Sequence, residues 1–424
     1  MVQETYKTTW LAKVPEHWNR LRIKNIFAEI DDRSETGTEE LLSVSHYTGV
    51  TKKRDSLENE TDFISNAKTL VGYKKVAEND LVSNIMLAWN GSLGISKYKG
   101  ITSPAYCVYR IKGDNNPNYY GYLFSTAFMK AEFRKKSFGI IDSRLRLYSD
   151  KFFSIPAPVP PKTEQDQIVA YIKEQSKKIK HFIKKKQTFI DLLKEQKQSV
   201  IDKLLINKGK KVKIKYCVSK IGGGVTPKGG ATVYKKSGIL FLRSQNIYND
   251  GLYLDNVAYI TEEIHSSMKG SQVEKNDVLI NVTGGSIGRC YTYFLEEEAN
   301  VNQHVTIIRP ILDILTPEFL MLQLQSDRIQ HQIDMIEGAS REGLTKGDIS
   351  NYYLYLPPKE EQAQIVSHIK TETAKIDQAI AKAQKEIELI KEYKEAMVAE
   401  AVLGKFNKNT KPTRANNAPV ENIK

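Results

Sequence analysis

The sequence predicts an α+β protein in which two β-rich globular domains alternate with two long helices, as an internal repeat with pseudo-twofold symmetry. The first observation behind this prediction is a stretch that occurs twice, with ten of fourteen positions identical: PPKTEQDQIVAYIK at 160–173 and PPKEEQAQIVSHIK at 357–370. The second is that each copy opens a long segment without Pro or Gly, in which apolar residues recur at helical spacing. The third is that each segment follows a region of similar length with short β-like runs.

The first domain is expected to span residues 1–157. Its stretch AENDLVSNI at 77–85 returns 197 residues later as EKNDVLINV at 274–282, and GSLG at 91–94 returns as GSIG at 285–288. Runs such as ILFLRSQNI and DVLINVTG, bounded by Gly, Asn and Asp, predict a mainly β core with a few helices. The repeat therefore extends upstream of the helices, with similar ends and divergent middles.

The first long helix is expected at 158–207 and the second at 355–405. Apolar residues in both recur in steps of four and seven, an eleven-residue period that is typical of a nearly straight helix. Such a stripe could pack on its own domain, but a globular domain rarely offers a flat partner about 65 Å long. We therefore favour pairing of the two copies as a coiled coil, which must be antiparallel because the second helix starts from the second domain. The predicted packing residues of these spacer helices are Ile168, Ile172, Ile179, Ile183, Ile190, Ile365, Ile369, Ile376, Ile380 and Ile387.

The second domain is expected at 208–354, and residues 406–424 are expected to form a polar, disordered tail. The charges of the two helical copies differ. Residues 162–210 contain 13 lysines and 6 acidic residues, a net charge of +7, whereas 359–405 contain 8 lysines and 9 acidic residues, a net charge of −1. Unlike charge favours pairing of one copy with the other over pairing of two identical copies.

Composition limits the classes of partner. The chain of 424 residues has 63 Lys and Arg against 50 Asp and Glu, a net charge of +13, which favours a polyanionic partner. Its three cysteines are far apart and its seven histidines are scattered, so the sequence predicts no disulfide framework and no metal site. Neither a secretion signal nor a membrane span is indicated, and a cytoplasmic location is expected.

Catalytic motifs are not found. NPNYY at 116–120 resembles the Asn-Pro-Pro-Tyr loop of amino methyltransferases, but its third residue differs and the second copy reads TPEFL at 316–320, so both are interpreted as helix N-caps followed by Pro. GGGVTPKGG at 222–230 lacks the Gly-Lys-Ser/Thr ending of a phosphate loop and is interpreted as a mobile loop. We therefore expect a non-catalytic chain.

Each domain has polar residues suited to phosphates and base edges. In the second domain they follow a predicted strand, and in the first they lie after LLSVSHYTG and before GSLG. A single such residue is more often a solvated surface group, and the set gains weight from its occurrence in duplicated domains. The predicted DNA-binding residues are Lys52, Lys53, Arg54, Trp89, Asn90, Arg144, Arg243, Ser244, Gln245, Asn246 and Arg341.

With its duplicated PPKxEQxQIV opening and an N-terminal PEHW at 15–18, the chain resembles the specificity subunit of a type I restriction-modification enzyme over nearly its whole length. The resemblance implies two target-recognition domains that read a bipartite sequence in double-stranded DNA, and helices that seat two modification (methyltransferase) subunits. Restriction subunits would join the complex. These partner subunits would methylate adenine and cleave DNA, and they would bind the cofactors S-adenosylmethionine, ATP and Mg. The resemblance implies no cofactor in this chain.

Two other classes stay open. One is a scaffold with two carbohydrate- or peptide-binding β domains on a coiled-coil strut. Salt-sensitive binding to duplex DNA would favour a DNA-binding subunit over this scaffold. The other is a self-sufficient methyltransferase, which methyl transfer by the isolated chain would reveal.

Overall fold

The computed structural model describes residues 10–45, 48–52, 69–141, 144–206, 208–335 and 343–406, together with the backbone of 336–339. The chain divides into two compact units, Met1–Lys185 with Glu386–Lys424, and Lys186–Lys385. The expected tail lies outside the described residues from 407 onward. Each unit contains one β-rich region and one end of each long helix.

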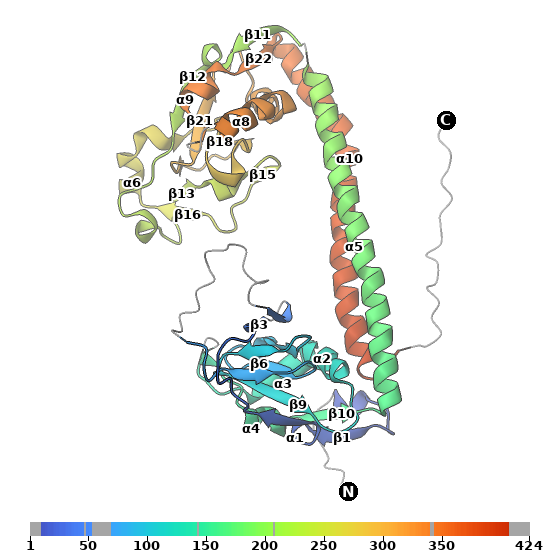
Figure 1. Ribbon diagram of the computed structural model, residues 1–424. Helices are drawn as coiled ribbons and strands as arrows, with labels where there is room; N and C mark the ends of the chain where they lie inside the picture. The colour runs from blue at the N-terminus through green and yellow to red at the C-terminus, as the bar shows by residue number, and fades with distance from the viewer. Residues whose placement is uncertain are drawn as a thin grey trace, which may run out of the picture. The chain divides into compact units, whose positions relative to one another are not determined.

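The two long helices are present as predicted (Figure 1). Helix α5 spans Lys162–Leu205 and α10 spans Lys359–Ala401. Each begins directly after a Pro-Pro pair, because proline fixes φ near the helical value but cannot supply the amide hydrogen that a helix interior needs. Neither contains Pro or Gly, so neither has a residue that would break or kink it.

The first unit is built around an antiparallel sheet with the strand order β2-β9-β6-β7. The unit also contains the two-stranded pairs β1-β10, β3-β4 and β5-β8. Aromatic residues of helices α2 and α3 share a hydrophobic core with the sheet. The strands are β1 Asn19–Arg22, β2 Phe27–Ile30, β3 Leu42–Ser45, β4 Gly49–Lys52, β5 Lys74–Val76, β6 Leu81–Asn84, β7 Leu93–Ile95, β8 Gly100–Thr102, β9 Tyr106–Ile111 and β10 Pro156–Val159. The helices are α1 Ile23–Ile26, α2 Pro117–Ser125, α3 Ala127–Lys136 and α4 Ser149–Ser154.

The second unit has a corresponding antiparallel sheet, β12-β21-β18-β19, and a further four-stranded sheet, β16-β13-β20-β17. Its strands are β11 Lys210–Lys213, β12 Val218–Gly223, β13 Ile239–Leu242, β14 Ile247–Tyr248, β15 Gly251–Leu252, β16 Ala258–Ile260, β17 Gln272–Val273, β18 Val278–Asn281, β19 Cys290–Thr292, β20 Ala299–Val301, β21 Val305–Pro310 and β22 Tyr353–Leu356. Its helices are α6 Glu262–Ser267, α7 Pro317–Gln325, α8 Asp327–Ala339 and α9 Lys346–Asn351. The pairs β1-β10 and β11-β22 occupy equivalent places in the two units.

The repeated fragments 77–85 and 274–282 form the same turn and strand in the two units. Asn79 and Asn276 both adopt a left-handed backbone, with φ of 72° and 75°, a conformation that Asn tolerates better than most residues. The next residue is a buried aspartate in each case, Asp80 or Asp277, and its carboxylate accepts two hydrogen bonds from an arginine on the neighbouring strand. The predicted fold class, two β-rich domains with long helices and an internal repeat, is therefore confirmed.

Within each unit, the start of one long helix packs near the end of the other. In the first unit, Ile168 and Ile172 near the start of α5 share a core with Val398 near the end of α10, and the Tyr119 hydroxyl donates to the Val402 carbonyl at 2.9 Å. In the second unit, Ile201 near the end of α5 shares a core with Ile365 near the start of α10. The two helices therefore run antiparallel in both units.

A glutamine in the repeated motif anchors each long helix to its unit. Gln165 Oε1 accepts from the Asn116 amide at 2.7 Å, and Gln362 Oε1 accepts from the Thr316 amide at 2.9 Å. The Gln165 Nε2 donates to Asn115 Oδ1 and the Pro160 carbonyl, and the Gln362 Nε2 donates to the Ile314 and Pro357 carbonyls. The glutamine of the repeated motif therefore has the same anchoring role in both units.

The same contacts bear on the N-cap interpretation. Asn116 is the N-cap of α2, and its side chain accepts a hydrogen bond from the Asn118 amide, as predicted. Thr316 occupies the N-cap position of α7, but its hydroxyl makes no capping hydrogen bond. Pro follows each of them as the first helical residue. The 116–120 segment is therefore the start of a helix.

Replacing Gln362 with alanine is expected to lower the free energy of unfolding by about 1 to 3 kcal/mol, because buried donors and acceptors would lose their partner. Gln362 is fully buried, whereas Gln364 on the same helix is exposed, so Gln364→Ala is the matched control. Urea denaturation followed by circular dichroism measures both. Equal losses in the two variants would show that the hydrogen bonds of Gln362 do not anchor the helix.

Candidate nucleic-acid interface

Two groups of the predicted DNA-binding residues, Trp89 with Asn90 and the 243–246 segment, lie near one end of a central strand in their units. Strands β6 and β18 end at the buried residues Asn84 and Asn281, and a short 3-10 helix follows each: η4 Ala88–Asn90 in the first unit and η10 Gly284–Ser286 in the second. Trp89 and Asn90 lie on the first of these turns. In the second unit the Asn281 amide donates to the Ser244 carbonyl at 2.9 Å, which brings the 243–246 segment beside the equivalent turn.

Arg243 follows β13 and is half-buried. Its Nη2 donates to the Asn256 carbonyl at 2.9 Å, and its guanidinium lies over the Tyr234 ring with 5.7 Å between the guanidinium carbon and the ring centroid. Its Nε is buried, with no hydrogen-bond partner among the described residues. One edge of the guanidinium is thus anchored to the main chain, and the residue as a whole stays half-buried. The donor set of a guanidinium suits a phosphate or a guanine edge.

Asn246 has a different role from the one predicted for it. Its side chain is 1% exposed, its Oδ1 accepts from the Arg243 amide at 3.0 Å, and its Nδ2 donates to the Tyr253 carbonyl at 2.8 Å. The amide group therefore holds the turn and is turned away from solvent. Ser244 is half-buried and Gln245 is exposed, so the turn presents these two residues with Arg243.

In the first unit, Trp89 is half-buried and Asn90 is exposed. The Trp89 indole donates to the Met86 carbonyl at 3.2 Å, and the Arg134 guanidinium lies 5.0 Å from the centre of its ring. Stacking of Arg on Trp makes a platform that is both cationic and aromatic, which is the combination that binds nucleic-acid backbone and bases. Arg134 was not among the predicted residues, because it comes from α3, distant in the chain.

The other predicted residues of the set are not brought to these turns by any contact within the described part of the chain. Lys52 ends β4, where its ammonium lies 3.5 Å from Glu40 and 5.7 Å from the centre of the Tyr98 ring. Arg144 is exposed beside the β-bridge between Phe138 and Arg146. Lys53, Arg54 and Arg341 lie outside the described residues.

The second unit contains a further cation on an aromatic platform. The Arg289 guanidinium lies 5.0 Å from the centre of the Tyr248 ring, which packs on Tyr253 with 4.6 Å between centroids. The Asp250 carboxylate raises the pKa of Tyr253, whose exposed hydroxyl donates a hydrogen bond to it at 3.2 Å. Arg289 directly follows the repeated GSIG, and that position is the signal from which sequence reasoning could have found it.

The predicted packing residues line the two helices. Ile168, Ile172, Ile179, Ile190, Ile365, Ile369, Ile376 and Ile387 are buried. Ile183 and Ile380 are half-buried. In the second unit a direct ion pair joins the helices, with 2.6 Å between Lys197 Nζ and Asp377 Oδ1. Burial of one stripe on each helix stabilises the pair mainly through the hydrophobic effect, since an exposed ion pair contributes little.

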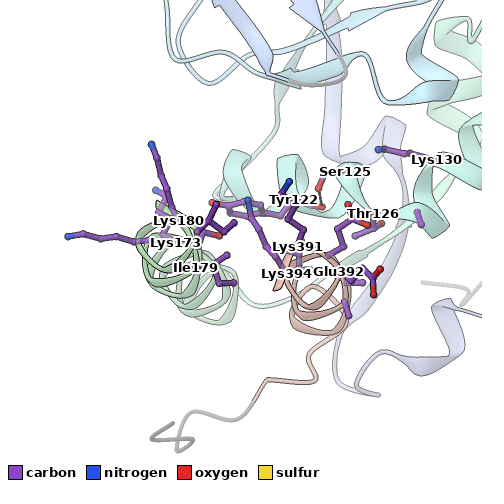
Figure 2. A pocket seen from close by; sticks show the side chains of 18 of the residues that line it. Tyr122, Ser125, Thr126, Lys130, Lys173, Ile179, Lys180, Lys391, Glu392 and Lys394 are labelled. Atoms are coloured by element: carbon purple, nitrogen blue, oxygen red, sulfur yellow. Dashed lines mark hydrogen bonds between the residues drawn. The ribbon is translucent and has the colours of Figure 1, made fainter. Parts of the chain in front are cut away.

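A large pocket opens in the first unit where α2 and α3 meet the two long helices (Figure 2). Its volume is 1280 Å³. Ile179 and Val398 contribute apolar wall, and the charged residues that line the pocket include Lys173, Lys180 and Lys394 together with Glu392 and Glu395. Across the described ranges, no helix is both long and apolar enough to cross a membrane.

The chain thus has a duplicated fold, with a short 3-10 turn at an equivalent place in each unit. The family model for the type I restriction modification DNA specificity domain matches the chain twice, at residues 15–190 and 210–389. The chain belongs to this family, whose role is specificity and not catalysis.

Several known proteins are similar to this chain. The Type I restriction enzyme EcoBI specificity subunit of Escherichia coli is 28% identical over 172 residues, which are 40% of this chain and 36% of that protein. The alignment thus spans about a third of the relative's length. A solved chain from work on the structural basis of complex assembly and conformational transition of the type I R-M system has a TM-score of 0.62 at 15% identity, over 93% of this chain and 99% of its own length. The HsdS subunit from Thermoanaerobacter tengcongensis gives a TM-score of 0.44 at 17% identity, over 96% and 100%.

Proposed function

We propose that the chain is the DNA-binding specificity subunit of a type I restriction-modification assembly in the cytoplasm. Each β-rich domain recognises one half of a bipartite sequence in double-stranded DNA, and the paired helices fix the length of the unspecified spacer. The chain directs modification subunits, which methylate adenine with S-adenosylmethionine, and restriction subunits, which cleave DNA with ATP and Mg. It performs neither reaction itself.

One observation carries this proposal. The family model matches two regions that share one sheet topology, yet their equivalent turns present different residues. Trp89 and Asn90 occupy the turn of the first unit, whereas Gly and Ser occupy that of the second, with Arg243 beside it. A shared scaffold with different contact residues is what two different half-sites require. The net charge of +13 supports a polyanionic ligand.

The proposal predicts that the purified chain alone transfers no methyl group to DNA and gains adenine methylation when the modification subunit is added. Binding to a duplex should weaken steeply as salt rises, since phosphate contacts release counterions. Methyl transfer is measured with tritiated S-adenosylmethionine and a DNA duplex. The salt dependence of duplex binding is measured by fluorescence anisotropy over a salt series. Methyl transfer by the isolated chain would sink the non-catalytic assignment. Salt-insensitive binding of a sugar or peptide, with no affinity for DNA, would instead support a scaffold.

Arg243→Ala is expected to weaken duplex binding by about 1 to 3 kcal/mol and to relax discrimination at one base pair, if Arg243 reads a guanine. If it contacts a phosphate, binding should fall equally for all sequences and the salt slope should shrink by about one. Lys275→Ala is a charge-matched control in the same unit, because Lys275 is paired with Glu296. Anisotropy with single-base variants of the target separates these outcomes, and an effect no larger than that of the control would remove Arg243 from the interface.

A further inference from the structure

Three side chains of the second unit converge at a place that the DNA-binding proposal does not use. Glu262 and His265 are three residues apart on α6, so they share one face of the helix. Glu298 immediately precedes β20. One potential ligand atom from each of the three lies within 4.8 Å of the other two. Both glutamates are exposed, whereas His265 is 8% exposed.

The imidazole of His265 has a defined orientation because of Asn300. The Asn300 Nδ2 donates to the Met268 carbonyl at 3.1 Å and to the Ser271 hydroxyl at 2.9 Å. The Asn300 Oδ1 therefore points at His265 Nδ1, 2.6 Å away, and must accept a hydrogen bond from it. In the neutral ring this places the hydrogen on Nδ1 and the lone pair on Nε2.

One imidazole nitrogen of His265 and two carboxylates share one small region, and Nε2 is the nitrogen that the contact with Asn300 leaves able to bind an ion. A cation between these groups would offset the repulsion between the two carboxylates. We propose that Glu262, His265 and Glu298 bind one divalent transition-metal ion of the zinc class. Imidazole nitrogen and carboxylate oxygen are both zinc ligands, and a ligating histidine usually donates its other N–H to an oxygen, as His265 does to Asn300.

The ligand types favour this class over magnesium or calcium, which take oxygen ligands almost exclusively. The three groups come from two segments that are separate in sequence, so a bound ion would cross-link α6 to the sheet at β20. Strand β20 pairs in parallel with β13, with Leu242 opposite Val301, and Arg243 follows Leu242 directly. The ion would thus stabilise the strands that support the Arg243 turn. This proposed metal site differs from the prediction from sequence, which was that the chain has no metal site.

The test uses the full-length chain, free of any affinity tag and stripped with a chelator. Isothermal titration with ZnCl₂ should give one ion per chain, and thermal unfolding should shift upward with zinc. Glu298→Gln should lower the affinity at least tenfold, in line with the loss of one ligand, and His265→Gln should lower it further. Glu263→Gln and Glu297→Gln remove the same charge from neighbouring exposed positions and should leave zinc binding unchanged.

Two outcomes would overturn the proposal. One is the absence of stoichiometric zinc binding to the wild-type chain. The other is an equal loss of affinity in Glu298→Gln and in its neighbour Glu297→Gln, which would indicate general attraction to an acidic surface. Because Glu298 is exposed, its variant is expected to fold even if His265→Gln does not. Substitution of Co²⁺ for Zn²⁺ adds an independent readout, since a change of ligand alters its visible absorption.

Discussion

Replacing Asp277 with alanine is expected to lower the free energy of unfolding of the second unit by about 3 to 5 kcal/mol, the usual cost of removing one partner of a buried ion pair. The Asp277 side chain is fully buried and that of Arg309 is 23% exposed. The carboxylate accepts from Arg309 Nε at 2.8 Å, from Nη2 at 2.9 Å and from the Glu274 amide at 2.7 Å. Its loss would leave a guanidinium largely out of water without its main partner.

A second cation makes this loss larger. Burial lowers the pKa of Lys220, repulsion from Arg309 lowers it further, and Asp277 acts in the opposite direction. Without Asp277 the two cations would face each other with less compensation. The matched variant Asp80→Ala in the first unit should cost less, about 1 to 3 kcal/mol, because the side chain of Arg110 is 50% exposed and can turn to solvent.

The two variants can be measured separately in one chain. All three tryptophans, Trp10, Trp18 and Trp89, belong to the first unit. Tryptophan fluorescence during urea denaturation should therefore respond to Asp80→Ala and hardly to Asp277→Ala, whereas hydrogen exchange of β18 and β21 should respond to Asp277→Ala. Replacing both partners with Leu and Met should recover much of the loss. If the single variant were as stable as the wild type, the buried pair would not support this sheet.

Lengthening both long helices together is expected to change the DNA spacer without changing either half-site. Lys197 and Asp377 face each other across the pair, so four residues inserted after Lys197 and four inserted before Asp377 extend both helices at the same level. Each insertion adds about 6 Å. Since DNA rises about 3.4 Å per base pair, the unspecified middle of the recognition sequence should widen by one or two positions.

Insertion into α5 alone is the control for this experiment. It should shift the isoleucine stripe of one helix against the other, separate Lys197 or its neighbours from their partners, and lower stability. Adenine-methylation mapping in cells that also express the modification subunit measures the spacer, and thermal unfolding measures the stability. A paired insertion that folds normally and leaves the spacer unchanged would show that these helices do not set its length.

The long helices and the duplicated sheet could be predicted because their signals are local and repeated. The eleven-residue apolar period defines a buried stripe whatever lies opposite it, and the stretch at 77–85 recurs with its Asn-Asp turn intact. The anchoring role of the glutamine in the repeated motif could not be predicted. Gln165 and Gln362 bind main-chain groups some 45 to 50 residues away, and only the fold brings those groups together.

The binding residues were harder to predict for a similar reason. Asn246 and Gln245 are chemically alike and adjacent, yet one amide is consumed by its own turn and the other is exposed. Pattern alone does not say which way a side chain points after a strand ends. Arg134 gains its place over Trp89 from α3, and Glu298 reaches His265 across 33 positions of sequence, so neither shows a short motif.

The most direct test of the account is to map methylated adenines in cells that express the modification subunit with either the native chain or a chain whose residues 222–350 come from a relative. A bipartite methylated motif is expected for the native chain. In the exchanged chain, one half-site should change while the other half-site and the spacer length stay the same. A change in both half-sites, or a motif without an unspecified middle, would contradict the claim that each β-rich domain reads its own half of the DNA sequence.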